Sequence, residues 1–216
     1  LFTMSYSQGG YMMPDKYASF SELASYEVYN QDYKIQFEIR PSNIIMLAIH
    51  GGGIETGTSE LAVGLAGNEY SYYIFEGLKK AGNADLHITS THFDEPHALT
   101  IISKEDYVVS FHGYNDKSEK HTKIGGADKA LRSKVHEALV SKGFSTEILS
   151  DQDPFSGTSP RNITNKTARR MGVQIEISKA QREAFFATNT RNERKNSKTQ
   201  EFFEYISAIR SAFPLR

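Results

Sequence analysis

Two histidines and one glutamate stand where a metal site could form. His50 follows the apolar run NIIMLAI at 43–49, and a glycine-rich turn separates it from Glu55. His112 follows the apolar run at 107–111 and is itself followed by glycine. Imidazole nitrogens and carboxylate oxygens both bind Zn²⁺ at roughly 2.0–2.2 Å, and glycines let the backbone turn tightly enough to return Glu55 towards His50. Two histidines and one glutamate leave a fourth position open, which is typical of catalytic zinc sites.

The same residues allow other interpretations. HGGG is also the motif by which lipases and esterases supply backbone N–H groups to a tetrahedral oxyanion. That chemistry calls for a nucleophile elbow, G-x-S-x-G, and the chain contains only GTSEL and GTSPR, which lack the closing glycine. Glu55 could instead cap the helix that follows it, beside Thr56 and Thr58, and His50 could be a simple turn residue.

Glu176 stands inside an otherwise apolar strand pattern, GVQIEIS at 172–178. Its neighbours Val173, Ile175 and Ile177 share one face of that strand. A buried carboxylate is costly unless it is paired or has a catalytic task. We therefore expect Glu176 either to meet a cation or to take part in catalysis.

The remaining histidines are weaker candidates. His92 and His97 surround FDEP and are expected to be loop residues beside the site, with metal ligation as an alternative. His87 is expected to be structural, and His121 and His136 to lie at the surface.

Strand and helix patterns alternate along the chain and must position these residues. This alternation predicts a single α/β domain, with a mostly parallel or mixed central sheet and helices on both faces. Because ligands bind beyond the C-terminal ends of such strands, His50, His112 and Glu176 should meet at one rim. The loop at 149–161 contains two prolines and a glycine and is expected to be a binding loop. Strands are predicted at 33–39, 43–49, 85–91, 107–112, 144–149 and 172–178, and helices at 58–81, 128–143 and 199–213.

Composition excludes several classes of protein. The chain of 216 residues has a net charge of −1, which argues neither for nucleic acid as a partner nor for an acidic tail. It has no cysteine, so disulfides and thiolate ligands are excluded. No apolar run approaches the ~20 residues that cross a bilayer, and the N-terminus has no signal-peptide pattern. We expect residues 1–14 to be an extension, with a cloning remnant before Met4, and the protein to be made in the cytoplasm.

Five segments together resemble a known family. AIHGGGIETGTSELA, HITSTHFDEPHA, VVSFHG, SPRNITNKT and GVQIEIS occur in this order, from about Asp15 onward. In this they are similar to the poly-γ-glutamate hydrolases encoded by bacteriophages of Bacillus and to related bacillar proteins. The resemblance implies that 15–216 is a zinc hydrolase domain, a compact relative of the zinc carboxypeptidases.

The resemblance also implies a set of roles. His50, Glu55 and His112 would hold one zinc ion per chain. Glu176 would be the general base for a zinc-activated water that attacks the γ-glutamyl amide carbonyl. A phage enzyme of this kind would act on bacterial capsule, inside the host or after host lysis, and is expected to be a monomer that binds neither nucleic acid nor membrane.

Local positive charge suits the anionic polymer that this resemblance implies as substrate. Residues 158–198 contain ten Lys or Arg and three acids, a net charge of +7. Such a segment would attract a polyanion, and arginine pairs with carboxylates in a bidentate manner. The expected substrate contacts are Arg161 and Asn162, then Arg182, with Asn165 a weaker candidate.

Two other functions remain open from the sequence. The first keeps the zinc chemistry but acts as an amidase or carboxypeptidase on other peptides. The second is a non-enzymatic module that binds polyanions through the basic segment, with binding that weakens steeply as salt rises.

Overall fold

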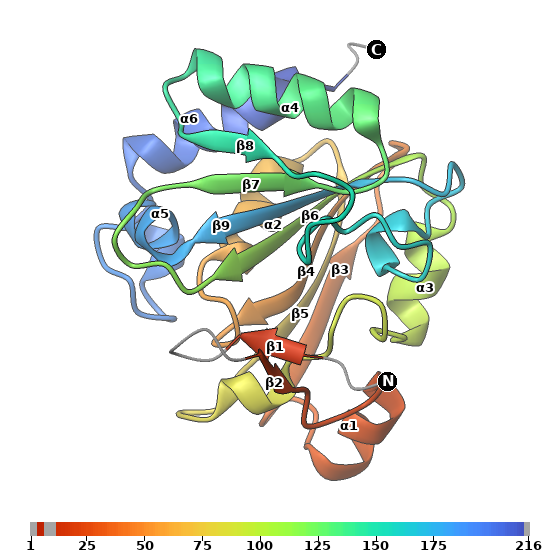
Figure 1. Cartoon of the computed structure of the whole chain (residues 1–216). Helices are drawn as coiled ribbons and strands as arrows, with labels where there is room; N and C mark the ends of the chain where they lie inside the picture. Colours follow the sequence, from red (N-terminus) through yellow and green to blue (C-terminus); the bar gives the residue numbers. More distant parts are fainter. Residues whose placement is uncertain (1–3, 7–11, 214–216) are drawn as a thin grey trace.

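A seven-stranded mixed sheet forms the centre of the protein (Figure 1). The computed structural model describes residues 4–6 and 12–213. The strand order across the sheet is β3-β5-β4-β6-β9-β7-β8. The strands are β3 (Tyr33–Glu38), β4 (Ile44–Gly52), β5 (Ser71–Gly77), β6 (Tyr107–Tyr114), β7 (Thr122–Gly125), β8 (Thr146–Ile148) and β9 (Val173–Ser178).

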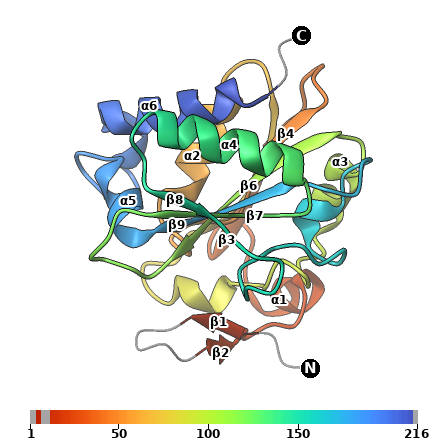
Figure 2. The same cartoon turned by 45° about the horizontal axis from the view of Figure 1, so that its top comes forward.

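Helices cover both faces of this sheet (Figure 2). The helices α2, α4 and α6 pack on one face, where Leu61, Val135 and Phe202 join the larger apolar cluster. The helices α1 and α3 lie on the other face, where Leu23 and Ile102 join the second cluster. The predicted single α/β domain with a mixed sheet is therefore confirmed. The helices are α1 (Phe20–Tyr26), α2 (Thr58–Ala66), α3 (Pro96–Ile102), α4 (Lys129–Ser141), α5 (Lys179–Ala184) and α6 (Gln200–Ser211), with short 3₁₀ turns η1 (Asn83–Leu86), η2 (Ile163–Asn165) and η3 (Arg194–Asn196).

The predicted N-terminal extension contains a small sheet of its own. β1 (Met4–Tyr6) and β2 (Met12–Pro14) pair in antiparallel fashion. The boundary of the extension at residue 15 stays a prediction, and residues 1–3, expected as a cloning remnant, lie outside the described residues.

The three central strands run in one direction. β4 pairs with β6, and β6 with β9, in parallel register. Their C-terminal ends therefore meet at the same edge, as expected for a ligand site in an α/β sheet. β3 and β7 run antiparallel to their neighbours β5 and β9. In these registers Glu176 lies opposite His112 on one side and opposite Lys123 on the other.

The central strands have one apolar and one polar face near this edge. On β9, Val173, Ile175 and Ile177 pack into the cluster beneath α2, α4 and α6. Side chains alternate between the two faces of a strand, so Gln174 and Glu176 point to the opposite face. Burial of the apolar face fixes the register, because a slip by one residue would bury the polar side chains instead.

Two predicted elements are wrong. The helix predicted at 58–81 ends at Ala66, and Ser71–Gly77 forms the strand β5 between β3 and β4. The C-cap of α2 is Gly67, at a φ of 54°, and the aromatic sequence SYYIF that follows favours a strand. The segment 85–91 is a 3₁₀ turn followed by an irregular loop rather than a strand. Its backbone groups are used by the site instead of by a sheet.

Candidate metal centre

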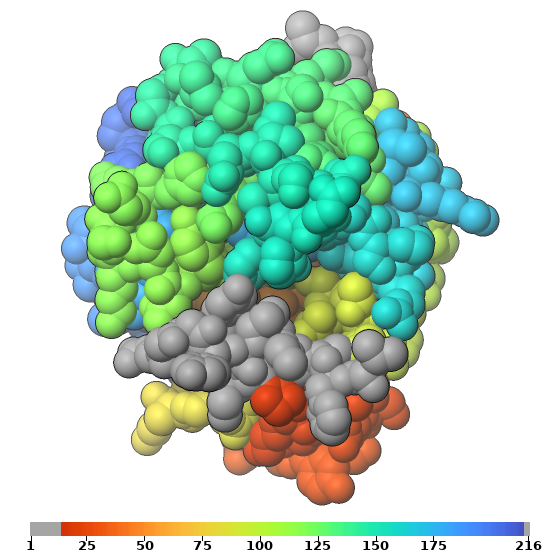
Figure 3. Space-filling view, in the orientation of Figure 1, coloured from red at the N-terminus to blue at the C-terminus, as the bar shows by residue number. Residues whose placement is uncertain are grey.

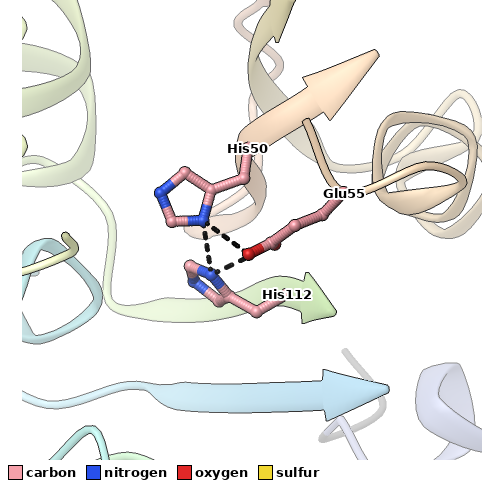
Figure 4. A group of neighbouring side chains, drawn as sticks. All are labelled: His50, Glu55 and His112. Atoms are coloured by element: carbon pink, nitrogen blue, oxygen red, sulfur yellow. Dashed lines mark hydrogen bonds and ion pairs between the residues drawn. The ribbon is translucent and has the colours of Figure 1, made fainter. Parts of the chain in front are cut away.

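Three side chains converge at the C-terminal edge of the sheet (Figure 4). His50 lies near the end of β4, Glu55 in the turn that follows, and His112 in β6. The Nδ1 atom of His50 lies 3.1 Å from Glu55 Oε1 and 3.1 Å from His112 Nδ1. The Nδ1 atom of His112 lies 3.7 Å from Glu55 Oε2. The predicted convergence of residues 50, 55 and 112 is therefore present.

The spacing of these atoms fits a tetrahedral zinc ion. Ligands at 2.0–2.2 Å from zinc stand about 3.3–3.6 Å from one another. The two Nδ1 atoms lie 3.1 Å apart, and they lie 3.1 and 3.7 Å from the two different carboxylate oxygens of Glu55. One ligand atom from each residue lies within 4.8 Å of the other two, which a small shift of the side chains brings to that range. Two nitrogens and one oxygen are a ligand set that zinc accepts, with a fourth position available for water or substrate.

Each histidine of this triad presents the nitrogen that a metal needs. The Nε2–H of His50 donates to the carbonyl of Ile88 at 2.8 Å, which leaves its Nδ1 unprotonated when the ring is neutral. The Nε2 of His112 lies 2.8 Å from Ser110 Oγ, so that its Nδ1 also faces the site. Outer partners of this kind fix the tautomer and orientation of metal-binding histidines.

The turn from His50 to Glu55 is closed by backbone contacts. The N–H of Glu55 donates to the carbonyl of His50 at 2.8 Å. Gly52 has a φ of +66°, and a Cβ there would lie 2.5 Å from the carbonyl oxygen of Gly77. The carboxylate of Glu55 accepts from the N–H of Gly113 at 2.9 Å. Glu55 thus points at the histidines, whereas the N-cap of α2, Gly57, receives no side-chain hydrogen bond.

Burial and mutual charge set the protonation of the metal-free triad. Burial raises the pKa of Glu55, but the neighbouring His50 and His112 outweigh it and hold that pKa below its usual value. Burial lowers the pKa of His50, yet the charge of Glu55 raises it overall. Burial lowers the pKa of His112 to about 3. At neutral pH His112 is therefore uncharged and ready to ligate. Glu55 favours a proton on His50, and such a proton must leave when a cation binds.

A second carboxylate–histidine pair lies directly beside the triad. The ring of His87 stacks on that of His50, with centroids 3.9 Å apart. Its Nδ1–H donates to Asp15 at 2.7 Å, and the other oxygen of Asp15 accepts from the N–H of Thr89 at 2.6 Å. The Nε2 of His87 lies 3.8 Å from Glu55 Oε1. Asp15 thus fixes the orientation of a third imidazole at the edge of the triad.

Glu176 lies on the same edge, one strand away from His112. Its side chain is 6% exposed, and its Oε1 accepts from Gln174 Nε2 at 3.1 Å. Burial, followed by the negative charge of Glu55, raises the pKa of Glu176 to about 8. The carboxyl is therefore poised to exchange a proton near neutral pH, which is what a general base or acid requires.

One cavity of about 690 Å³ is lined by the triad, His87 and Glu176. Its walls include the loop residues 154–159 and the segment 89–91. The space-filling view shows the teal surface of this loop beside the yellow segment that follows η1 (Figure 3). The predicted binding loop thus forms one side of the cavity into which His50, His112 and Glu176 face.

The four predicted substrate contacts lie in different environments. Arg161 is exposed and does not line the cavity. Asn162 lines the cavity, and its amide donates to Gln174 at 2.8 Å. Asn165 is buried, and its amide nitrogen donates to the carbonyls of Gly157 and Ser159. Contact with a substrate stays a prediction for all four residues.

The fourth of them, Arg182, is 5% exposed and supports the backbone around the site. Its guanidinium donates to the carbonyls of Ile177, Thr56 and Tyr114 at 3.1, 2.8 and 3.2 Å. A Cβ on Gly113 would lie 2.4 Å from this group, so glycine permits the contact. Arg182 thereby links the turn after β4 to the ends of β6 and β9.

The basic segment does not form a single charged face. Arg169 pairs with Asp128 and buried Arg194 pairs with Glu60, each at 2.8 Å. Among its described residues, Lys179 and Arg182 are the lysine and arginine that line the cavity. Lys179 is partly exposed and has an ion pair with Glu183 at 3.8 Å. Its ammonium is therefore the more available of the two charges.

Sequence reasoning missed four residues at the site: Asp15, His87 as part of the site, Ser110 and Gln174. Asp15 and His87 are 72 residues apart, and no local pattern connects them. Ser110 and Gln174 carried a signal that could have been used. Each stands two residues before a predicted site residue on the same strand, and therefore on the same face.

The chain is similar to proteins of one family. The family described as poly-gamma-glutamate hydrolase matches residues 17–208, a range that includes the triad and Glu176. The SPbeta prophage-derived UPF0714 protein YoqZ of Bacillus subtilis strain 168 is 45% identical over 195 residues, which cover 90% of this chain and 70% of that protein.

Two solved structures share the fold closely. The structure of a bacteriophage poly-gamma-glutamate hydrolase is 42% identical, with a TM-score of 0.86 over 92% of this chain and 96% of that one. A zinc-free apo structure of YndL is 40% identical, with a TM-score of 0.88 and the same coverage. In the described part of the present chain, no helix is long and apolar enough to cross a membrane.

Proposed function

The chain belongs to the poly-gamma-glutamate hydrolase family, and we propose that it hydrolyses γ-glutamyl amide bonds of poly-γ-glutamate with one zinc ion held by His50, Glu55 and His112. The observation that carries this proposal is the convergence of two imidazoles and a carboxylate at one wall of a cavity that also holds Glu176. A zinc ion there supplies a Lewis acid that polarises the amide carbonyl and lowers the pKa of water.

In this proposal Glu176 moves the protons of the reaction. Its carboxylate takes the proton from the attacking water and then delivers it to the nitrogen of the leaving γ-amide. Its position supports this role, because Glu176 is the register partner of His112 in the neighbouring strand and lines the same cavity as the triad. Its raised pKa supports both the uptake and the return of a proton near neutral pH.

Other residues of the chain hold these groups in place. Ser110 and the carbonyl of Ile88 orient the two histidines. Arg182 fastens the turn that carries Glu55, through the carbonyl of Thr56. Rigid placement matters because reacting groups must be held close to their productive geometry.

The substrate carries one free α-carboxylate per residue, so its site needs positive charge. We assign the first such contact to Lys179, whose side chain lines the cavity at the start of α5. We assign a contact farther from the scissile bond to Arg161, which is exposed at the end of the cavity loop.

The test compares γ-linked with α-linked polyglutamate as substrates of the purified protein. We expect shortening of the γ-linked polymer alone, loss of this activity in chelator, and its return with zinc. Glu176→Gln should abolish cleavage while elemental analysis still finds one zinc per chain. Cleavage of α-linked polymer or of short peptides instead would favour a general zinc peptidase. Salt-sensitive binding without any cleavage would favour a polyanion-binding module.

A further inference from the structure

A chain of buried amides leads from η2 to the catalytic carboxylate. Asn162 Nδ2 donates to Gln174 Oε1 at 2.8 Å, and Gln174 Nε2 donates to Glu176 Oε1 at 3.1 Å. The three side chains are 3%, 5% and 6% exposed, respectively. Because so little of these residues reaches solvent, hydrogen bonds within the protein hold the three side chains in defined positions.

Backbone groups determine which way each amide faces. The N–H of Thr164 donates to Asn162 Oδ1 at 2.9 Å, so the Nδ2 of Asn162 must point towards Gln174. Gln174 then has to present its oxygen to Asn162. Its nitrogen is left to face Glu176 and the carbonyl of Phe155, the second at 3.4 Å. One backbone N–H, two residues beyond Asn162, thus sets the orientation of both amides.

We propose that Gln174 and Asn162 are positioning residues, which hold the Glu176 carboxylate in one orientation and supply it with a fixed N–H donor. This inference rests on the proposed role of Glu176 as the base. It gives Asn162 a task different from substrate contact. Asn162 acts on catalysis only through Gln174, because its described side-chain bonds are to Thr164 and Gln174.

The same amide connects the carboxylate to the cavity loop. Gln174 Nε2 also faces the carbonyl of Phe155, and a Cβ on Gly157 would lie 2.9 Å from the Gln174 amide. Gly157 has a φ of +62°, a conformation that glycine adopts readily. The loop that forms one cavity wall is therefore packed onto the residue that holds Glu176.

The test removes the donor without changing charge. Gln174→Met keeps similar bulk but offers no N–H to Glu176. A lost donor destabilises the charged carboxylate and raises the pKa of Glu176. We expect the acidic limb of the kcat/KM profile to move up by about one pH unit, which is about a tenfold loss on the acidic side. The groups that face Glu176 are Glu55, His50, Arg182, His112, Lys123 and Tyr114, and the substitution alters none of them.

Asn162→Ser separates positioning from substrate contact. A serine still offers an oxygen to the N–H of Thr164 but is too short to reach Gln174. In Asn162→Ser we expect the acidic limb of the kcat/KM profile to move up by less than in Gln174→Met. We also expect Asn162→Ser with Gln174→Met to shift it no further than Gln174→Met alone. An additive loss that falls mainly on KM would show that Asn162 contacts substrate and would overturn the inference.

One further measurement and one backup variant keep the outcome decisive. The pKa of Glu176, measured in metal-free protein from the ¹³C shift of its carboxyl and assigned with Glu176→Gln, should rise by the same amount in the variants. This measurement does not need activity. It therefore distinguishes failure of the proposed positioning by Gln174 and Asn162 from failure of the proposed hydrolysis. An unchanged pKa of Glu176 in these variants would refute the proposed positioning role. Should Gln174→Met not fold, Gln174→Glu fills the same space and should raise that pKa further.

Matched controls come from exposed amides outside the cavity. Asn68→Ser and Gln200→Met make the same chemical changes at the surface. Both should leave the limb, the zinc content and the melting temperature unchanged. Zinc content should also be unchanged in the Gln174 and Asn162 variants, since neither residue belongs to the triad.

Discussion

Replacement of Glu176 by glutamine should change how the stability of the metal-free protein depends on pH. Burial and the charge of Glu55 raise the pKa of Glu176 to about 8, from an ordinary 4.5. The folded protein therefore holds this proton more tightly than the unfolded chain does. As pH rises from 4.5 to about 8 the unfolded chain has released the proton while the folded protein still keeps it. The free energy of unfolding must fall across this window.

The size of the effect follows from the two pKa values. The interval from 4.5 to about 8 corresponds to about 5 kcal/mol at 1.36 kcal/mol per pH unit. Glutamine has a similar shape and carries no proton to lose. The difference in unfolding free energy, Glu176→Gln minus wild type, should therefore grow by up to about 5 kcal/mol from below about pH 4 to above about pH 9, with most of the change between about pH 5 and pH 8. A hydrogen bond lost in the glutamine variant changes this difference by the same amount at every pH, so it does not alter the slope.

The assay is urea unfolding of both proteins in chelator, at several pH values and constant ionic strength. The raised pKa of His50 also removes stability as pH rises above its unfolded value, but it does so in both proteins and largely cancels. A flat difference across the window would refute the reasoning, because Glu176 would then have an ordinary pKa. With saturating zinc the slope should shrink, since a cation beside the carboxyl lowers its pKa.

Three further predictions address the metal and the substrate. His112→Ala should lower zinc affinity by more than the roughly 10–100-fold that loss of an outer partner costs, measured by competition with a chromogenic chelator. Zinc binding near neutral pH should release protons from the His50–Glu55 pair and from Glu176. The enthalpy of zinc binding, measured by calorimetry, should therefore vary with the ionisation enthalpy of the buffer. Identical enthalpies in all buffers would contradict this. Lys179→Gln should raise KM for the γ-linked polymer by up to about fivefold at unchanged kcat, and the effect should fade as salt rises.

The sequence by itself determined the elements at the centre of the fold and the identity of the triad. The run 43–49 is apolar throughout, and it forms β4, which is buried on both faces. Alternation in β9 separated Val173, Ile175 and Ile177 from Glu176. Such patterns are local, because side chains of a strand alternate with a period of two whatever lies around it. Parallel strand ends meet at one edge, which is why the meeting of His50, His112 and Glu176 could be anticipated.

Local patterns failed where the surroundings decided the conformation. Residues 58–81 contain a helix and a strand, and the change at Gly67 depends on the place of β5 between β3 and β4. Strand preference reflects packing against neighbours more than an intrinsic tendency, so a single window could not reveal it.

Only the tertiary structure decided how the site is supported. It brings Asp15 to His87 and Arg182 to Thr56, across 72 and 126 residues, respectively. It also directs the amide of Asn162 to Gln174 and so to Glu176. These contacts depend on which buried polar atoms find partners once the sheet, the helices and the cavity loop are packed. No spacing along the chain encodes that outcome, because burial, and the need of each buried donor for an acceptor, exists only in the folded protein.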